Sequence, residues 1–114
     1  MIVKNILKPL ELATTNSAAF DGTYKVLTTG LAHQCNILRI TNGCKLPITV
    51  SFDGGITDHE WIWPETSLQL NAQTNSMPTN QVALIAKGTA ISVKGAASVG
   101  LIYLSGYYQP ASAL

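Results

Sequence analysis

Charged side chains are scarce in this sequence of 114 residues. Only 11% of the residues are Asp, Glu, Lys or Arg, whereas soluble domains usually carry roughly 25%. Seven basic residues stand against six acidic ones, and the formal net charge is +1. Nucleic acids and anionic membranes attract clustered positive charge, so this balance argues against both as partners. Sparse charge also favours a protein that works in an assembly, because a free monomer would be poorly soluble.

Long apolar runs are also missing. No stretch approaches the roughly 18 consecutive apolar residues of a transmembrane helix. The N-terminal segment interrupts its apolar residues with Lys4, Asn5, Lys8 and Pro9, so it contains no apolar core of a secretory signal. We therefore expect the chain to fold in the cytoplasm in which it is made.

Cysteine is nearly absent, and Cys35 and Cys44 are the whole set. Without a secretory signal we expect two reduced thiols that pack as small hydrophobic side chains; a disulfide between them is the alternative. A chain of this length forms one domain and buries a single core without the help of disulfides or a metal.

Catalytic motifs are absent as well. The sequence has no glycine-rich dinucleotide pattern, no P-loop and no Gly-x-Ser-x-Gly elbow. No nucleophile, base and oxyanion donor can be named together, so we predict no enzymatic activity and no cofactor.

Four polar residues, Asp53, Asp58, His59 and Glu60, lie within eight positions. A calcium loop needs oxygen ligands at alternating positions around a glycine, and a zinc site needs two separated pairs of Cys or His. Neither spacing is present, so we predict no metal site. We interpret residues 53–55 as a turn and residues 58–60 as the polar start of a strand. A small enzyme or metal-binding domain remains the alternative, and it predicts that the four side chains converge on one point.

Short β-prone runs separated by turn sequences fill most of the chain. Residues 48–52, for example, alternate Ile, Val and Phe with Thr and Ser, which gives a strand one apolar and one polar face. Asn42-Gly43 and Asp53-Gly54-Gly55 tolerate the positive φ angles of tight turns. We expect strands over residues 23–29, 36–41, 47–52, 60–63, 66–71, 82–85, 90–94 and 99–108, with a further one over residues 1–7.

This pattern of eight or nine short strands without a helical period predicts an all-β fold, an antiparallel sandwich or a closed barrel. We place the β domain at residues 23–108 and a flexible tail at residues 109–114. Residues 1–22 form an N-terminal arm that hooks a neighbouring subunit, or an edge strand followed by a loop. Residues 72–81 are a polar loop that crosses between sheets or carries binding.

The longest β-prone run, Val99–Tyr108, is apolar on both faces, so we predict a central strand. Its glycines, Gly100 and Gly106, indicate a bulge or a close approach of two backbones.

Both tryptophans lie in one short run. In a strand, Trp61 and Trp63 point to one face and Ile62 to the other. On an inward face they are core residues, and on an outward face they form a contact hot spot or a platform for sugar stacking. We favour one partly buried tryptophan, with the pair reaching an interface. Pro64 confines this run to a sheet edge or a strand end.

Two long stretches, ILRITNGCKLPITVSFDGGITDHEWIWPETSLQLN and TNSMPTNQVALIAKGTAISVKGAASVGLIYLSGYY, resemble small β-sandwich virion proteins of tailed bacteriophages. In these, a hairpin strand leads through S-F-D-G-G and an aromatic strand to a K-G-T-x-I-x-V-K-G turn pair and a closing Y-L-S-G-Y strand. The likeness covers roughly residues 35–108. It implies a jelly-roll-like β-sandwich without enzymatic activity, and a role as a capsid decoration (cement) protein.

Such decoration proteins lie across junctions between major capsid subunits, often as dimers or trimers, and hold the shell against the pressure of the DNA. The resemblance therefore implies the major capsid protein as partner, a homo-oligomer, and a place on the capsid exterior after synthesis in the host cytoplasm. The apolar and aromatic residues that we expect at interfaces are Ile2, Val3, Ile6, Leu7, Trp61, Trp63, Tyr107 and Tyr108.

A different virion role is the alternative. A head-fibre, collar or tail component would bind a host-surface carbohydrate through Trp61, Trp63, Tyr107 and Tyr108. It predicts exposed ring faces beside Asn, Asp or Gln side chains.

Overall fold

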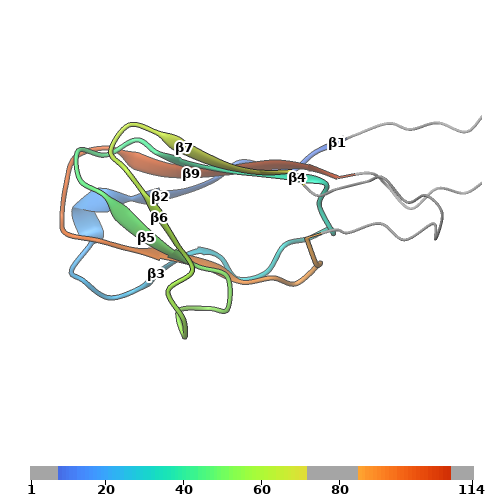
Figure 1. Cartoon of the computed structure of the whole chain (residues 1–114), viewed down its shortest axis with the longest axis horizontal. Helices are drawn as coiled ribbons and strands as arrows, with labels where there is room; N and C mark the ends of the chain where they lie inside the picture. The colour runs from blue at the N-terminus through green and yellow to red at the C-terminus, as the bar shows by residue number, and fades with distance from the viewer. Residues whose placement is uncertain (1–7, 72–84, 109–114) are drawn as a thin grey trace, which may run out of the picture.

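Two packed antiparallel sheets make up the protein (Figure 1). The structure, a computed structural model, describes residues 8–71 and 85–108. The expected strand over residues 1–7, the loop over residues 72–81, most of the strand over residues 82–85 and the tail lie outside these residues, as do Ile2, Val3, Ile6 and Leu7. None of the helices in residues 8–71 and 85–108 is long and apolar enough to cross a membrane.

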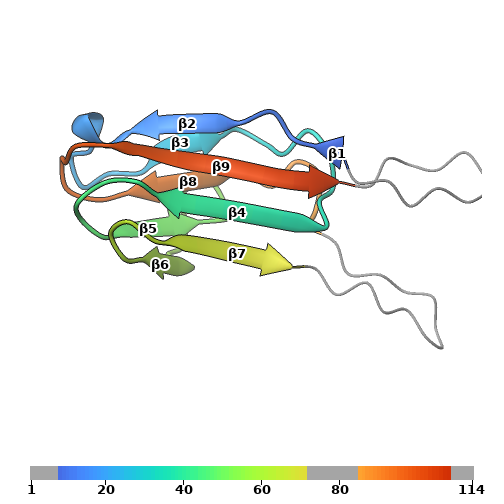
Figure 2. The same ribbon diagram turned by 90° about the horizontal axis from the view of Figure 1, so that it is seen from above.

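Nine strands and one 3-10 turn form the described part. The strands are β1 (Lys8–Pro9), β2 (Ala13–Asn16), β3 (Lys25–Thr28), β4 (Ile37–Asn42), β5 (Ile48–Ser51), β6 (Glu60–Ile62), β7 (Ser67–Asn71), β8 (Ile91–Lys94) and β9 (Leu101–Tyr108), and the turn η1 (Ser17–Ala19) follows β2. In the five-stranded sheet β1 and β2 both pair with β9, which is followed by β4 and β7 (Figure 2). The four-stranded sheet has the order β3-β8-β5-β6.

The pairing of the strands is nested. β2 pairs with β9, β3 with β8, β4 with β7 and β5 with β6, all antiparallel, as in one long hairpin. Two further pairings, β4 with β9 and β5 with β8, roll that hairpin into two sheets. This is the strand order of a jelly roll. The predicted all-β antiparallel sandwich is confirmed.

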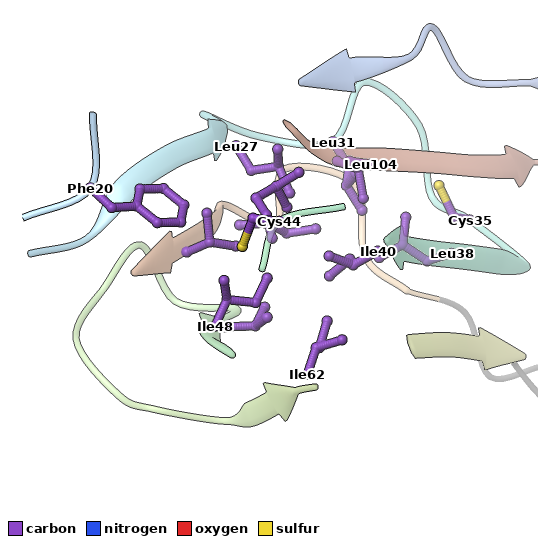
Figure 3. Close-up of a cluster of buried hydrophobic side chains, with 14 residues drawn as sticks. Phe20, Leu27, Leu31, Cys35, Leu38, Ile40, Cys44, Ile48, Ile62 and Leu104 are labelled. Carbon is purple, nitrogen blue, oxygen red and sulfur yellow. The ribbon is translucent and has the colours of Figure 1, made fainter. Parts of the chain in front are cut away.

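The core lies between the sheets, where alternate residues of each strand point inward. On β4, Leu38 and Ile40 are buried while Arg39 between them is exposed. The buried side chains from both sheets form one cluster, part of which is labelled in Figure 3: Phe20, Leu27, Leu31, Cys35, Leu38, Ile40, Cys44, Ile48, Val50, Ile62, Ile91, Val93, Ile102 and Leu104. The alternation that predicted the strands is therefore the alternation that builds the core.

Both cysteines belong to this core as free thiols. Figure 3 shows Cys35 and Cys44 in separate parts of the cluster. Burial raises the pKa of the Cys35 thiol. The prediction of two reduced, packed cysteines is confirmed.

β9 is a central strand, as predicted, and two glycines, Gly106 within it and Gly100 just before it, allow close approaches of backbones. A Cβ on Gly106 would lie 2.8 Å from the Ile37 carbonyl oxygen. Gly100 has a φ of +122°, and a Cβ there would lie 2.2 Å from the Gly43 carbonyl oxygen. No side chain fits at either position, because the Cβ atom that a substitution adds would overlap backbone atoms.

Two short edge strands, β1 and β2, lie within residues 8–16. β1 and β2 pair with β9, from Lys8 opposite Tyr108 to Asn16 opposite Leu101. β2 was not predicted, because Ala13–Asn16 has no apolar alternation and its pairing uses backbone groups. The Thr15 hydroxyl also donates to the Val26 carbonyl at 3.0 Å, which links the edges of the two sheets.

A buried asparagine joins the two sheets at the opposite side. Asn42 ends β4 in the five-stranded sheet, and its side chain is fully buried. Its Nδ2 group donates to the carbonyl oxygens of Leu46 (2.9 Å), Ile62 (3.1 Å) and Trp63 (3.2 Å). The three carbonyl oxygens share the two hydrogens of this amide nitrogen. Its Oδ1 accepts from the Cys44 N–H at 3.0 Å. One amide thus fixes the β4–β5 turn and the end of β6.

We expect Asn42→Ala to destabilise the fold by about 3 kcal/mol or more, because several buried backbone groups lose their partner. Urea denaturation followed by tryptophan fluorescence measures this. Asn71→Ala is the matched control: the Asn71 side chain is exposed and, within residues 8–71 and 85–108, accepts from Gln69 alone, so a change within about 0.5 kcal/mol is expected. Equal effects of the two substitutions would contradict the role of Asn42.

Candidate functional site

The two tryptophans lie on the outside of the four-stranded sheet. Trp61 is 50% exposed and Trp63 is 61% exposed, while Ile62 between them is 3% exposed. Their ring centroids are 4.3 Å apart and the ring planes are tilted by 59°. The alternation predicted for this run is present, and neither ring belongs to the core.

The backbone around the tryptophans explains their placement. Among the described strands, β6 is an edge strand that pairs with β5 alone, with Trp61 opposite Thr49. β6 ends at Ile62, just before Trp63 and Pro64. The Asn42 side chain holds the carbonyl oxygens of Ile62 and Trp63. Pro64 therefore follows a strand end at a sheet edge, as predicted.

Asp53 organises the loop between β5 and β6, which projects from the four-stranded sheet away from the other sheet (Figure 1). Its Oδ1 accepts from the backbone N–H groups of Ile56 (3.0 Å) and Thr57 (2.9 Å). A hydrogen bond from the Ser51 hydroxyl, followed by these backbone bonds, holds the pKa of Asp53 well below its usual range. Gly54 and Gly55 have positive φ angles. The interpretation of residues 53–55 as a turn is confirmed.

Asp58 fastens the same loop to the sheet. Its Oδ1 accepts a hydrogen bond from the Tyr24 hydroxyl and lies 3.2 Å from Lys94 Nζ. The Lys94 ammonium lies 4.7 Å from the centre of the Tyr24 ring, a cation–π distance. The Tyr24 bond, followed by Lys94, lowers the pKa of Asp58.

Among the four polar residues singled out in the sequence, His59 approaches Asp53, whereas Asp58 binds other partners. His59 Nδ1 accepts the Phe52 N–H at 3.0 Å, and its Nε2 lies 4.0 Å from Asp53 Oδ2. Asp58 is bound to Tyr24 and Lys94 instead. In residues 8–71 and 85–108 no three His, Cys, Asp or Glu side chains lie close enough to share a metal ion. The convergence that a catalytic or metal site of these four residues requires is not seen.

A shallow hollow opens on the solvent beside Trp61. It has a volume of about 450 Å³ and is lined by Thr49, Asp58, His59, Glu60 and Trp61. Three of the four polar candidates thus reach one surface feature, although they do not meet at a point.

The two candidate tyrosines lie elsewhere. Tyr107 is 45% exposed on the outer face of the five-stranded sheet. Tyr108 stacks on His33, with ring centroids 3.8 Å apart and planes 5° apart. The fold therefore brings Trp61 and Trp63 together and separates them from Tyr107 and Tyr108.

The outer face of the five-stranded sheet was not singled out by the sequence. Outward residues of neighbouring strands are linked across it: Arg39 donates to Gln69 Oε1 from Nη2 (2.8 Å) and Nε (3.2 Å), and the Thr41 and Ser67 hydroxyls lie 3.0 Å apart. Arg39 is the one charged residue of β4, β7 and β9. The alternation of Tyr103, Ser105 and Tyr107 along β9 indicates that these three side chains share one face of the strand. The sequence does not reveal which strands lie beside β9, so it does not define the whole face.

Comparisons with known proteins do not assign the chain to a family. No family model matches the sequence, and no curated protein matches it. A solved structure described as "Bacillus endospore appendages form a novel family of disulfide-linked pili" is similar with a TM-score of 0.47 and 15% identity, over 93% of this chain and 88% of that chain. A likeness at this level says nothing about function.

Tyr24 makes the attachment of the loop sensitive to high pH. Partial burial and the hydrogen bond to Asp58 raise the pKa of Tyr24 to about 12. Because the folded state favours the neutral phenol, its stabilising effect is complete below the unfolded value of about 10 and is lost as the pH rises towards 12. We expect absorbance at 295 nm to show one tyrosine that titrates late. Tyr24→Phe should remove that step and Tyr107→Phe should keep it; a late step that survives Tyr24→Phe would contradict the assignment.

Proposed function

We propose that this chain is a non-enzymatic structural protein of a bacteriophage virion. Specifically, it is a capsid decoration protein that binds across junctions of the major capsid protein and stabilises the shell. The observation that carries the proposal is the open outer face of the five-stranded sheet. It has a single charged residue on its three longest strands and presents Tyr103, Tyr107 and Arg39, residue types that are enriched in protein interfaces.

The side chains of this face are held in place before any partner binds. Arg39 is bonded to Gln69, and Gln69 donates to Asn71 Oδ1 at 2.9 Å. A partner therefore meets a surface whose side chains have little conformational freedom left to lose. This suits a protein that acts only by adding contact area.

The size of the face supports an oligomeric mode of binding. Four neighbouring columns of strands, each about six residues long, cover roughly 400 Å² in projection. A stable interface buries about 800 Å² on each partner. A homo-dimer or homo-trimer that engages several capsid subunits at once would compensate for the small area of each contact. Once one subunit is bound, the high effective concentration of the others raises the overall affinity.

The N-terminal sequence is proposed to add to this contact. The first described strand, β1, begins at Lys8 and pairs with β9, with Lys8 opposite Tyr108. In this proposal Ile2, Val3, Ile6 and Leu7, which precede Lys8 in the sequence, provide apolar contacts with a neighbouring subunit.

Binding of this kind stabilises a shell by mass action. Contacts that exist only in the assembled geometry shift the equilibrium towards that geometry, and no reactive group is needed. The protein would be made in the host cytoplasm and added to the capsid exterior.

The proposal is tested by sedimentation with expanded capsids that lack the protein, followed by heating of the shells. We expect saturable binding at a symmetry-related ratio and a higher melting temperature of the capsid. Arg39→Glu and Tyr107→Ala should each weaken binding by about tenfold or more, because interface anchors dominate affinity.

Ile56→Ser is the matched control, since Ile56 is 86% exposed on the loop of the other sheet. It should bind like the natural chain. Failure of the folded protein to bind capsids would overturn the proposal.

A second virion role is supported by one observation. A head-fibre, collar or tail component that binds a host-surface carbohydrate needs exposed aromatic rings beside polar side chains, and Trp61 lies half exposed beside Asp58 and Glu60. Binding to host glycans without binding to capsids would favour this role.

A further inference from the structure

The free edge of β7 lacks the features that keep sheet edges apart. Among the described strands β7 pairs with β4 alone, and Figure 2 shows it at the margin of the five-stranded sheet. Its five residues, SLQLN, include no charged residue and no proline, and its register with β4 is continuous. Charges, prolines, bulges or short length protect most edge strands, because a bare edge pairs readily with another strand.

The other edges of the two sheets carry such protection. β6 is three residues long and includes Glu60. β1 consists of a lysine and a proline. The register of β3 with β8 is shifted by an irregularity, and the Thr15 hydroxyl of β2 donates to a carbonyl oxygen of β3 at 3.0 Å. Within residues 8–71 and 85–108, β7 is therefore the edge most open to pairing with another chain.

The backbone of β7 presents hydrogen-bonding groups in a regular row. The Asn42 N–H donates to the Thr66 carbonyl oxygen at 2.8 Å, and successive residues of an antiparallel strand direct their backbone groups alternately to its two sides. The two leucines of β7 therefore direct their N–H and C=O groups at β4. Ser67, Gln69 and Asn71 direct theirs at the free edge.

This row fits a second copy of itself. When two β7 strands meet antiparallel with a two-fold axis at Gln69, Gln69 faces Gln69 of the second copy and Ser67 faces its Asn71. All three residues then form hydrogen-bonded pairs, about six bonds in all, because each such pair exchanges two bonds. A shifted register makes fewer bonds, since it leaves at least one of the three residues without a partner in β7 of the second copy.

The side chains match in the same register. Leu68 and Leu70 are partly buried and pack against the core from the inner face of the sheet. In the pair, Leu68 lies opposite Leu70 of the second copy, so apolar side chains meet on the inner face and uncharged polar ones on the outer face. No like charges face each other, which favours the pairing.

A pair formed in this way also solves the problem of area. One outer face of the five-stranded sheet covers roughly 400 Å² in projection, so two faces joined into one continuous sheet cover roughly 800 Å². This is about the area that each partner buries in a stable interface. The two-fold axis stands perpendicular to the joined sheet, so both outer faces point the same way.

We propose that the free edge of β7 is the contact through which two copies of this chain form a two-fold dimer with one continuous sheet. The inference rests on the proposed function for its purpose, because it names the contact of the oligomer that binds the capsid. The dimer itself forms without a capsid and is measured without one.

The test is analytical ultracentrifugation of the full chain at about 1–500 µM, where we expect a monomer–dimer equilibrium with a Kd of about 1–100 µM, because the contact is small. Gln69→Glu keeps an acceptor for Arg39, so the monomer is retained, but it places two carboxylates opposite each other. It should weaken the dimer about tenfold or more. Gln34→Glu makes the same change at an exposed residue outside β7 and should dimerise like the natural chain.

Two further experiments locate the axis and the edge. Gln69→Lys should also weaken the dimer, whereas an equal mixture of the Gln69→Glu and Gln69→Lys variants should restore it, because opposite charges then meet at the axis. Asn71→Pro removes an N–H that faces the free edge and leaves the bonds to β4 in place. It should weaken the dimer about tenfold or more, with an unchanged circular dichroism spectrum.

Three results would overturn the proposal. The first is a monomer at every concentration, which would mean that other residues of the same chain cover the edge. The second is a dimer that Gln69→Glu and Asn71→Pro leave unchanged. The third is growth of open-ended assemblies, which would indicate contact between two different edges. A monomer that still sediments with capsids would overturn this inference alone, and a dimer that does not would overturn the capsid function alone.

Discussion

The buried amide of Asn42 is the interaction on which the arrangement of the two sheets depends. It lies at the end of β4, the strand that pairs with both β7 and β9, and it binds backbone carbonyls at the end of β6 in the other sheet. A buried amide is stable only when its hydrogen-bonding groups have partners, so it fixes one relative position of the sheets. An apolar side chain of similar size could fill the space but would not specify that position.

The same amide connects the core to the surface chemistry. By holding the carbonyls of Ile62 and Trp63 it sets the end of an edge strand, and the alternation of that strand then turns both tryptophans outward. The loop before β6 is fastened separately, through Asp53 within the loop and through Asp58 to Tyr24 and Lys94. Acidic residues that could suggest catalysis in the sequence therefore serve to order a loop and to shape the rim of a hollow.

The nested strand order gives the two sheets different outer faces. The five-stranded sheet leaves a face of linked polar side chains and tyrosines, which supports the proposed capsid contact. The four-stranded sheet carries the loop over residues 52–59 and the exposed tryptophan pair. Such a division suits a protein fixed to a shell on one side and exposed on the other.

Much of the local structure followed from the sequence alone. The alternation in residues 48–52, the glycine turn after Asp53, and Pro64 as the sign of a strand end depend on neighbouring residues, and these features were predicted correctly. The tight turn expected at Asn42-Gly43 was wrong: Gly43 is not among the glycines with positive φ, and the segment between β4 and β5 crosses from one sheet to the other. β2 was missed because an edge strand of Thr, Ala and Asn is specified by its partner rather than by its own pattern. The pairing of strands far apart in the chain, the exposure of Trp61 and Trp63, their separation from Tyr107, and the face built around Arg39 were decided only by the tertiary structure. Each of these depends on which strands become neighbours when the chain rolls up, and that choice is made by the packing of the whole core.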